Sequence, residues 1–110
     1  MEVKVEDIIK NVKEWVRNIQ KQYSGILQLG GITEKDKVYR VEFTCKNCMI
    51  EVMVDEPDWA PYRNVSCLIV ALVNDIPEVV YSWYDSDEDN ISDILEQLNR
   101  SIIVATNYEE

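Results

Sequence analysis

The chain has 110 residues, of which 46% are hydrophobic and 29% are charged, with three Gly, three Pro and no His. This composition is typical of one globular domain with a single core, and it excludes a largely disordered or low-complexity chain. We therefore expect residues 1–110 to form a single domain.

The formal net charge of −10 is distributed unevenly along the chain. Residues 1–46 carry nine Lys or Arg and seven Asp or Glu, whereas residues 47–110 carry two Lys or Arg and fourteen Asp or Glu. An acidic field of this kind repels phosphates and anionic lipids and attracts basic partners. Because affinity for nucleic acid comes mostly from Lys and Arg, we expect no direct nucleic-acid binding, and we expect a basic protein partner.

Apolar residues recur at helical spacing from Val5 to Tyr23 and predict an amphipathic helix of about five turns, with Gly25 as its C-terminal stop. Trp15 lies on the apolar side of this helix and is predicted to anchor the core. The first residues lack the apolar run of a signal peptide. The longest aliphatic run, residues 68–73, is far shorter than the roughly 20 residues that span a bilayer. These features predict a cytoplasmic protein that does not bind membranes.

Residues 26–32 predict a short strand with a bulge at its two glycines, followed by a turn over residues 33–36. A hairpin with Lys46-Asn47 as its two-residue loop comes next. Its register gives one wholly apolar face, on which the facing pairs are Cys45 with Cys48, Phe43 with Ile50, Val41 with Val52, and Tyr39 with Val54. On the other face Glu42 opposes Glu51, and the neighbouring Arg40 is expected to relieve their repulsion.

The proline-rich residues 56–64 predict a loop. Residues 66–73 are apolar at both parities, as in a strand that is covered on both faces or is central in its sheet. Residues 79–84 predict another strand, with Val79, Tyr81 and Trp83 on one side. A final helix places its apolar residues on one stripe: Ile91, Ile94, Leu95, Leu98, Ile102 and Ala105. The sequence thus predicts an α+β fold, with a single antiparallel sheet of about five strands packed by N- and C-terminal helices.

The order helix, three strands, loop, two strands, helix resembles the type III secretion chaperone-like superfamily, which includes the YbjN-type bacterial proteins. The resemblance is carried by VYRVEFTCKNCMIEVMVDE (residues 38–56) and VVYSWYDSDEDNISDILEQL (residues 79–98). It covers most of the chain, although the connecting segment is short and proline-broken where that family often has a helix. The resemblance implies a bacterial or phage protein that binds a protein or peptide and does not catalyse a reaction.

The segment DSDEDNISDILE, residues 85–96, has two interpretations. As a calcium loop of the EF-hand type, its ligands would be Asp85, Asp87, Asp89, Asp93 and Glu96, with Asn90 in place of the usual Gly. As the start of a helix, Asn90 is the N-cap, Asp93 completes a capping box, and the preceding acids stabilise the positive helix end. The apolar stripe that begins at Ile91 favours the capped helix, and we expect no cofactor.

The motif Cys45-Lys46-Asn47-Cys48 has the spacing of a zinc or redox motif. A structural zinc site needs four ligands, and the chain offers only Cys67 in addition and no His. On the apolar face of the hairpin, these cysteines are predicted to act as small hydrophobic residues. A metal site and a disulfide or redox switch remain alternatives. The lack of His also removes the commonest general base, so we predict that the chain is not an enzyme.

These features predict a small acidic binding protein that captures a basic or amphipathic protein segment, in a chaperone-like or an immunity- or antitoxin-like role. Trp59 either folds back over the hairpin end or is presented at an interface. Two alternatives are a calcium-dependent regulator and a nucleic-acid mimic that inhibits a defence or nuclease protein, with its acids along one exposed ridge. Homodimerisation is left open. The candidate partner-binding residues are Asp55, Glu56, Asp58, Trp59, Tyr62, Asp85, Asp87, Glu88 and Asp89.

Overall fold

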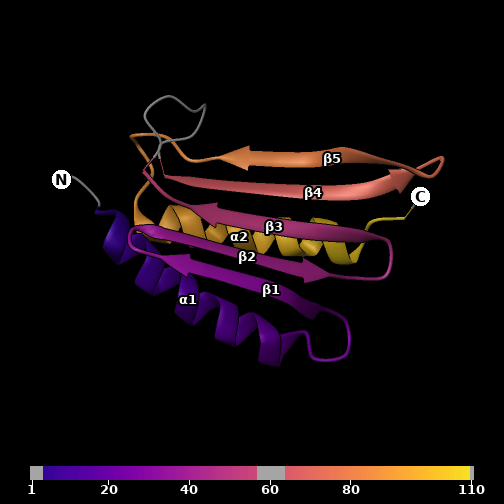
Figure 1. Cartoon of the computed structure of the whole chain (residues 1–110), viewed down its shortest axis with the longest axis horizontal. Coiled ribbons are helices and arrows are strands. Elements are labelled where there is room, and N and C mark those ends of the chain that lie inside the picture. Colours follow the sequence, from indigo (N-terminus) through magenta and orange to yellow (C-terminus); the bar gives the residue numbers. More distant parts are fainter. Residues whose placement is uncertain (1–3, 57–63, 110) are drawn as a thin grey trace.

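The computed structural model describes residues 4–56 and 64–109, which form two helices and five strands. The strands make one antiparallel sheet in which each strand pairs with the next one along the chain (Figure 1). The predicted α+β fold is therefore confirmed. The elements in chain order are α1 (Val5–Gln22), β1 (Gln28–Lys35), β2 (Val38–Thr44), β3 (Cys48–Val54), β4 (Val65–Val73), β5 (Ile76–Tyr84) and α2 (Ile91–Thr106).

The two helices pack on the same face of the sheet and touch each other (Figure 1). Trp15 on α1 joins the layers, because its indole Nε1 donates a hydrogen bond of 2.7 Å to Asn99 Oδ1 on α2 and its ring lies edge-on to Phe43 on β2. The inward residues of β2, β3 and β4 are almost completely buried beneath the helices. Among the described residues, no helix covers the other face of the sheet.

The β2–β3 hairpin has the predicted register, with Phe43 opposite Ile50 and Glu42 opposite Glu51. Cys45 N donates a hydrogen bond of 2.9 Å to Cys48 O, which closes the turn at Lys46-Asn47. Burial alternates strictly along both strands. A slip of one residue would turn the apolar set away from the helices, so the hydrophobic pattern selects this pairing.

The N-terminal part of the fold departs from prediction only in its boundaries. Helix α1 ends at Gln22, before the predicted Tyr23, and Gly25 adopts a φ of +85° in the turn that follows, where glycine is favoured. The predicted bulge occurs between Leu29 and Gly31. Strand β1 begins at Gln28 and continues to Lys35, so most of the predicted 33–36 turn is strand, because this segment pairs with the start of β2.

The β4–β5 hairpin contains a feature that the sequence pattern did not reveal. Asn74 and Asp75 both have positive φ, as a two-residue turn of type I′ requires. A bulge then shifts the register, because Ile69 pairs with Tyr81 whereas Val70 pairs with Val79. The prediction that Val79 shares a side with Tyr81 and Trp83 is therefore wrong, since one extra residue reverses the alternation.

Strand β4 lies inside the sheet between β3 and β5, but the helices cover only one of its faces. On the uncovered face, Leu72 is 55% exposed. The alternative in which residues 66–73 are covered on both faces is therefore wrong for the described part of the chain. Burial beneath a second layer therefore does not explain why the helix-free side of β4 carries the apolar residues Leu68, Val70 and Leu72.

The buried Cys67 on β4 predicts a loss of stability at alkaline pH. Burial raises the pKa of Cys67 from 9.0 to about 11, so between these values the folded state retains a proton that the unfolded chain has lost. Cys67 should then lower the free energy of unfolding by about 1.4 kcal/mol per pH unit over this interval. Thermal unfolding from pH 8 to about pH 11 measures this slope, and Cys67→Ala should make it shallower. An unchanged slope in Cys67→Ala would contradict the assignment.

Candidate functional site

The predicted acidic residues meet at one end of the sheet. Asp55 and Glu56 follow β3, and residues 85–89 follow β5. Asn64 joins these two segments, because its backbone N–H donates to Asp85 Oδ1 at 2.8 Å and its side-chain Nδ2 donates to Asp55 O at 3.0 Å. The other three predicted site residues, Asp58, Trp59 and Tyr62, lie outside the described residues.

Asp85 stabilises the fold and presents little surface to a partner. It is only 3% exposed, and its Oδ1 accepts hydrogen bonds of 2.8 Å from the backbone N–H groups of Asn64 and Val65. A buried carboxylate that accepts two backbone donors replaces the water that these N–H groups would otherwise bind. Asp85 therefore fastens the start of β4 to the end of β5.

The acids before α2 have local partners, as the capped-helix interpretation predicts. Asn90 Oδ1 accepts from Asp93 N at 2.8 Å, and Asp93 Oδ2 accepts from Asn90 N at 3.1 Å, which completes the capping box. Asp89 Oδ2 accepts from the backbone and the hydroxyl of Ser86. Helix α2 begins at Ile91, so residues 91–93 are helical and do not wrap an ion. No group of three or more possible ligands gathers within the described residues.

Three of the predicted acids, Glu56, Asp87 and Glu88, are exposed at this end of the molecule. Asp55 is half-buried, and its Oδ1 has no hydrogen-bond partner among the described residues. A further acidic pair, Asp75 and Glu78, is exposed at the opposite end of β5. These five exposed acids form two groups, roughly 23 Å apart, since seven residues of extended strand separate Glu78 from Asp85.

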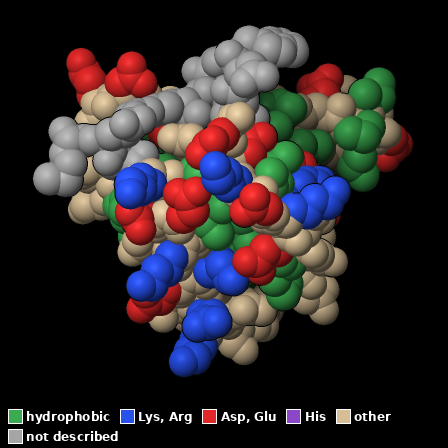
Figure 2. Space-filling view, turned by 60° about the vertical axis from the view of Figure 1, so that its left-hand side comes forward, with side chains coloured by type: hydrophobic (Ala, Val, Ile, Leu, Met, Phe, Trp, Pro, Cys, Tyr) green, Lys and Arg blue, Asp and Glu red, His purple; other side chains and the backbone are tan. Residues whose placement is uncertain are grey.

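The chain's charge asymmetry becomes a spatial asymmetry in the folded molecule. Residues 48–56 and 64–99, which include β3, β4 and β5, contain no Lys or Arg, whereas residues 4–46 contain nine. Because the strand order follows the chain order, these nine cations lie on α1, β1 and β2 or directly beside them, and Arg100 lies on α2. In Figure 2, Lys and Arg mix with acids in the middle and lower parts of the view, whereas its upper part shows acidic and hydrophobic side chains.

A second surface feature is an apolar area on the helix-free side of β3, β4 and β5. Cross-strand pairing places Met49, Val70 and Val79 in one row, and Leu72 and Val79 are 55% and 56% exposed. We call this area the open apolar face, and its residues are Met49, Met53, Leu68, Val70, Leu72, Val79 and Tyr84. Exposed apolar patches commonly mark interaction sites. The apolar residues at both parities of β4 were the sequence signal for it.

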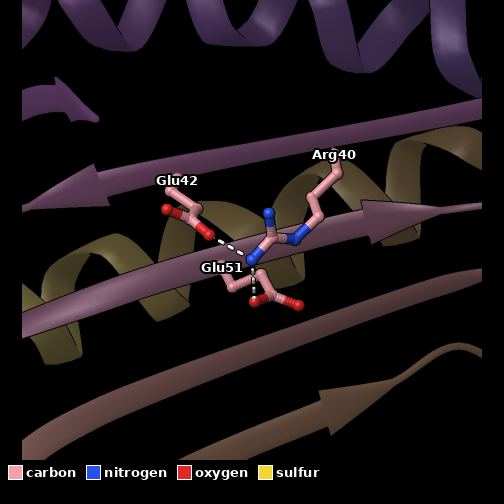
Figure 3. A network of polar contacts seen from close by, with 3 residues as sticks. All are labelled: Arg40, Glu42 and Glu51. Carbon is pink, nitrogen blue, oxygen red and sulfur yellow. Dashed lines mark hydrogen bonds and ion pairs between the residues drawn. The ribbon is translucent and has the colours of Figure 1, made fainter. Parts of the chain in front are cut away.

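An ion network lies on the same side of β2 and β3 as the open apolar face and reaches into it, because Glu51 is placed between Met49 and Met53 and pairs with Leu68. Arg40 Nη2 contacts Glu42 Oε1 and lies 2.9 Å from Glu51 Oε2, so a single guanidinium bridges the two facing glutamates (Figure 3). This is the predicted relief of the Glu42–Glu51 repulsion. The hydrogen bond from Arg40 to Glu51 and the charge of that glutamate raise the pKa of Arg40. With its cation engaged by two acids, the network adds no excess positive charge to this side of the sheet.

The Cys45-Lys46-Asn47-Cys48 motif is at the other end of the sheet, at the β2–β3 turn. Cys48 is 8% exposed and belongs to the core, as the hydrophobic interpretation predicts, and Cys45 is half-buried against it. Their sulfur atoms are 2.9 Å apart. The sequence predicted the pairing but not this close approach.

Comparisons with protein-family models, with curated proteins and with solved structures give no match. The resemblance to the type III secretion chaperone-like superfamily therefore stays a prediction. Neither helix in the described part of the chain has the length and apolar character needed to cross a membrane.

The Asp85 contacts predict a specific loss of stability. Asp85→Ala leaves the N–H groups of Asn64 and Val65 without their acceptor, which should lower the free energy of unfolding by roughly 2–4 kcal/mol. The exposed Glu88 is the control, because Glu88→Ala should change stability by less than about 0.5 kcal/mol. Urea denaturation measures both effects. Equal midpoints for the two variants would show that the Asp85 contacts contribute nothing.

Proposed function

We propose that this chain is a noncatalytic binding domain that captures a basic, amphipathic protein segment on its open apolar face. The observation that carries the proposal is the coincidence of two surfaces. The uncovered face of β3, β4 and β5 exposes apolar side chains, and the described residues 48–56 and 64–99 that build this part of the molecule contain no Lys or Arg.

Charge complementarity supports a cationic partner. Asp75 and Glu78 lie at one end of β5, Glu78 on the helix side of the strand because it pairs with Ala71, and Glu56, Asp87 and Glu88 lie at the other end. Attraction between such acids and a basic segment speeds association and sets its orientation. A helical partner would span the roughly 23 Å between the two acidic groups with about 15 residues, so its basic residues are expected at both ends of its apolar stripe.

The edge of the sheet favours docking on the face over the addition of a strand. The free side of β5 includes Pro77, Glu78 and the bulge opposite Ile69 and Val70. Proline lacks an N–H donor, and a bulge interrupts the ladder, so both oppose pairing with another strand. The exposed apolar side chains of β4 and β5 therefore offer the better contact area for an amphipathic segment.

Chaperone-like and immunity- or antitoxin-like roles are both forms of this proposal, because each requires capture of a protein segment. The alternative function, mimicry of a nucleic acid, requires acids along one exposed ridge. In the described residues the acids at the two ends of β5 are separated by apolar surface, which favours a partner that is itself amphipathic.

A peptide-binding measurement tests the proposal. The probe is a fluorescent helical peptide of about 15 residues with one apolar stripe and Lys at both ends, and the comparison is a scrambled peptide of equal composition. Fluorescence anisotropy should show saturable binding to the full chain that weakens as salt rises, because exposed charges are screened. Equal affinity for the scrambled peptide would overturn the proposal.

A matched pair of variants locates the binding surface. Val79→Lys places a cation on the open apolar face and should weaken binding about tenfold, which corresponds to about 1.4 kcal/mol. Val104→Lys makes the same chemical change at another exposed valine, on α2, and should leave the affinity unchanged. Equal losses in the two variants would mean that only net charge, and not this face, governs binding.

A further inference from the structure

The two thiols of the Cys45-Lys46-Asn47-Cys48 turn are close to bonding distance. Cys45 Sγ and Cys48 Sγ are 2.9 Å apart, whereas a disulfide bond is about 2.05 Å long. Their backbones are already fixed relative to each other, because Cys45 N donates to Cys48 O across the turn. Bond formation therefore needs a sulfur displacement of about 1 Å and no rearrangement of the sheet.

The third cysteine provides an internal comparison. Cys67 is fully buried on β4 and pairs with Val52, whereas Cys48 pairs with Ala71. Four residues of strand, or roughly 13 Å, therefore separate Cys67 from Cys48. Cysteines whose Cα atoms are more than about 7 Å apart cannot be bridged without backbone movement. The fold therefore places Cys67 too far from Cys48 for these two residues to form a disulfide.

Small molecules can approach the close pair. Three hollows, of about 540, 390 and 370 Å³, surround the turn. Cys45 lines two of them, Cys48 lines the third, and Lys46 lines all three. The Lys46 ammonium group attracts an anionic reagent to these hollows.

We propose that Cys45 and Cys48 form a reversible dithiol–disulfide site that exchanges with anionic low-molecular-weight disulfides of the glutathione class. The Cys45 thiolate attacks one sulfur of oxidised glutathione, which releases one glutathione thiolate and leaves a mixed disulfide. The Cys48 thiolate then attacks Cys45 Sγ and releases the second glutathione. The protein loses two hydrogen atoms, and one glutathione disulfide is reduced to two glutathione thiols.

The environment of the two sulfur atoms assigns their order of reaction. Cys45 is half-buried and lines two hollows, so it meets the reagent first. Burial raises the pKa of Cys48 to about 12, and the adjacent Cys45 adds to this shift, so Cys48 keeps its proton in the reduced state. Cys48 gives up this proton when it attacks Cys45 Sγ in the mixed disulfide, and it is placed to do so because the two sulfur atoms are 2.9 Å apart in the reduced chain.

The same turn is attached to the end of α2. The Cys45 and Cys48 sulfur atoms lie 3.6 Å and 3.4 Å from Ala105 O, and Asn47 Nδ2 donates to Tyr108 O at 2.9 Å. A disulfide has no S–H donor, so oxidation removes the thiol contacts to the last turn of the helix. Faster amide hydrogen exchange at residues 105–108 is the expected local effect in the oxidised chain.

Peptide mapping tests the proposed site in the unmodified full chain. The reduced protein is incubated with oxidised glutathione, alkylated and digested with trypsin without reduction. Trypsin cleaves after Arg40, Lys46 and Arg63, so residues 41–46 and 47–63 are held together only by the proposed disulfide. Mass spectrometry should find these peptides linked, and reduced glutathione should separate them. Recovery of both cysteines as alkylated thiols or as stable glutathione adducts would overturn the proposal.

Single substitutions separate the two steps. Cys48→Ser should stop at a glutathione adduct on Cys45, Cys45→Ser should lose both the adduct and the linked peptides, and Cys67→Ala should behave as the unmodified chain. Circular dichroism checks that each variant is folded. Linked peptides found only in a covalent dimer, or a disulfide that includes Cys67, would also overturn the proposal. The peptide mapping does not depend on whether the open apolar face captures a peptide, so the two proposals can fail separately.

Discussion

The sequential antiparallel pairing of the five strands is the constraint on which the rest of this structure depends. The turns at residues 36–37, 46–47 and 74–75 are two residues long, and such short connections pair a strand with its neighbour in the chain. Positions along the sequence therefore become positions across the sheet. The basic first part of the chain lies at one side and the acidic second part at the other.

The helices add a second constraint, because both of them cover the same face of the sheet. That arrangement buries one parity of β2, β3 and β4, and in the described part of the chain no helix lies over the other parity. On β2 the uncovered parity carries the Arg40 network, whereas on β4 and β5 it is mostly apolar. The open apolar face and the lack of Lys and Arg in the described residues 48–56 and 64–99 thus have one origin, in the placement of the second half of the chain.

The dithiol turn and the open apolar face are neighbours. The hollow of about 390 Å³ is lined by Cys48 and also by Met49, Val70 and Leu72, which belong to that face. A ligand at the end of the face therefore lies beside the cysteine pair. In contrast, Asp85 and the capping box of α2 hold the opposite end of the sheet together, so part of the acidic cluster is structural and only part of it is available to a partner.

Much of the architecture follows from local pattern. Alternating hydrophobic residues and a two-residue turn were sufficient to predict the β2–β3 register, including Arg40 beside two facing glutamates and Cys45 bonded to Cys48 across the turn. The helical stripes and the Asn90 cap follow in the same way, because their interactions are made within a few residues of the chain. The extent of β1 and the bulge in β5 were not predicted, since each depends on how a strand meets its neighbour.

The amino-acid sequence by itself determined the element order, the hairpin register and the uneven distribution of charge, because these properties depend on neighbouring residues and on composition. Only the tertiary structure decided that Asp85 is buried, that β4 has one uncovered apolar face and that two thiols are 2.9 Å apart. These properties arise where segments distant in sequence or opposite in the sheet come together, and whether a side chain is covered depends on what packs over it.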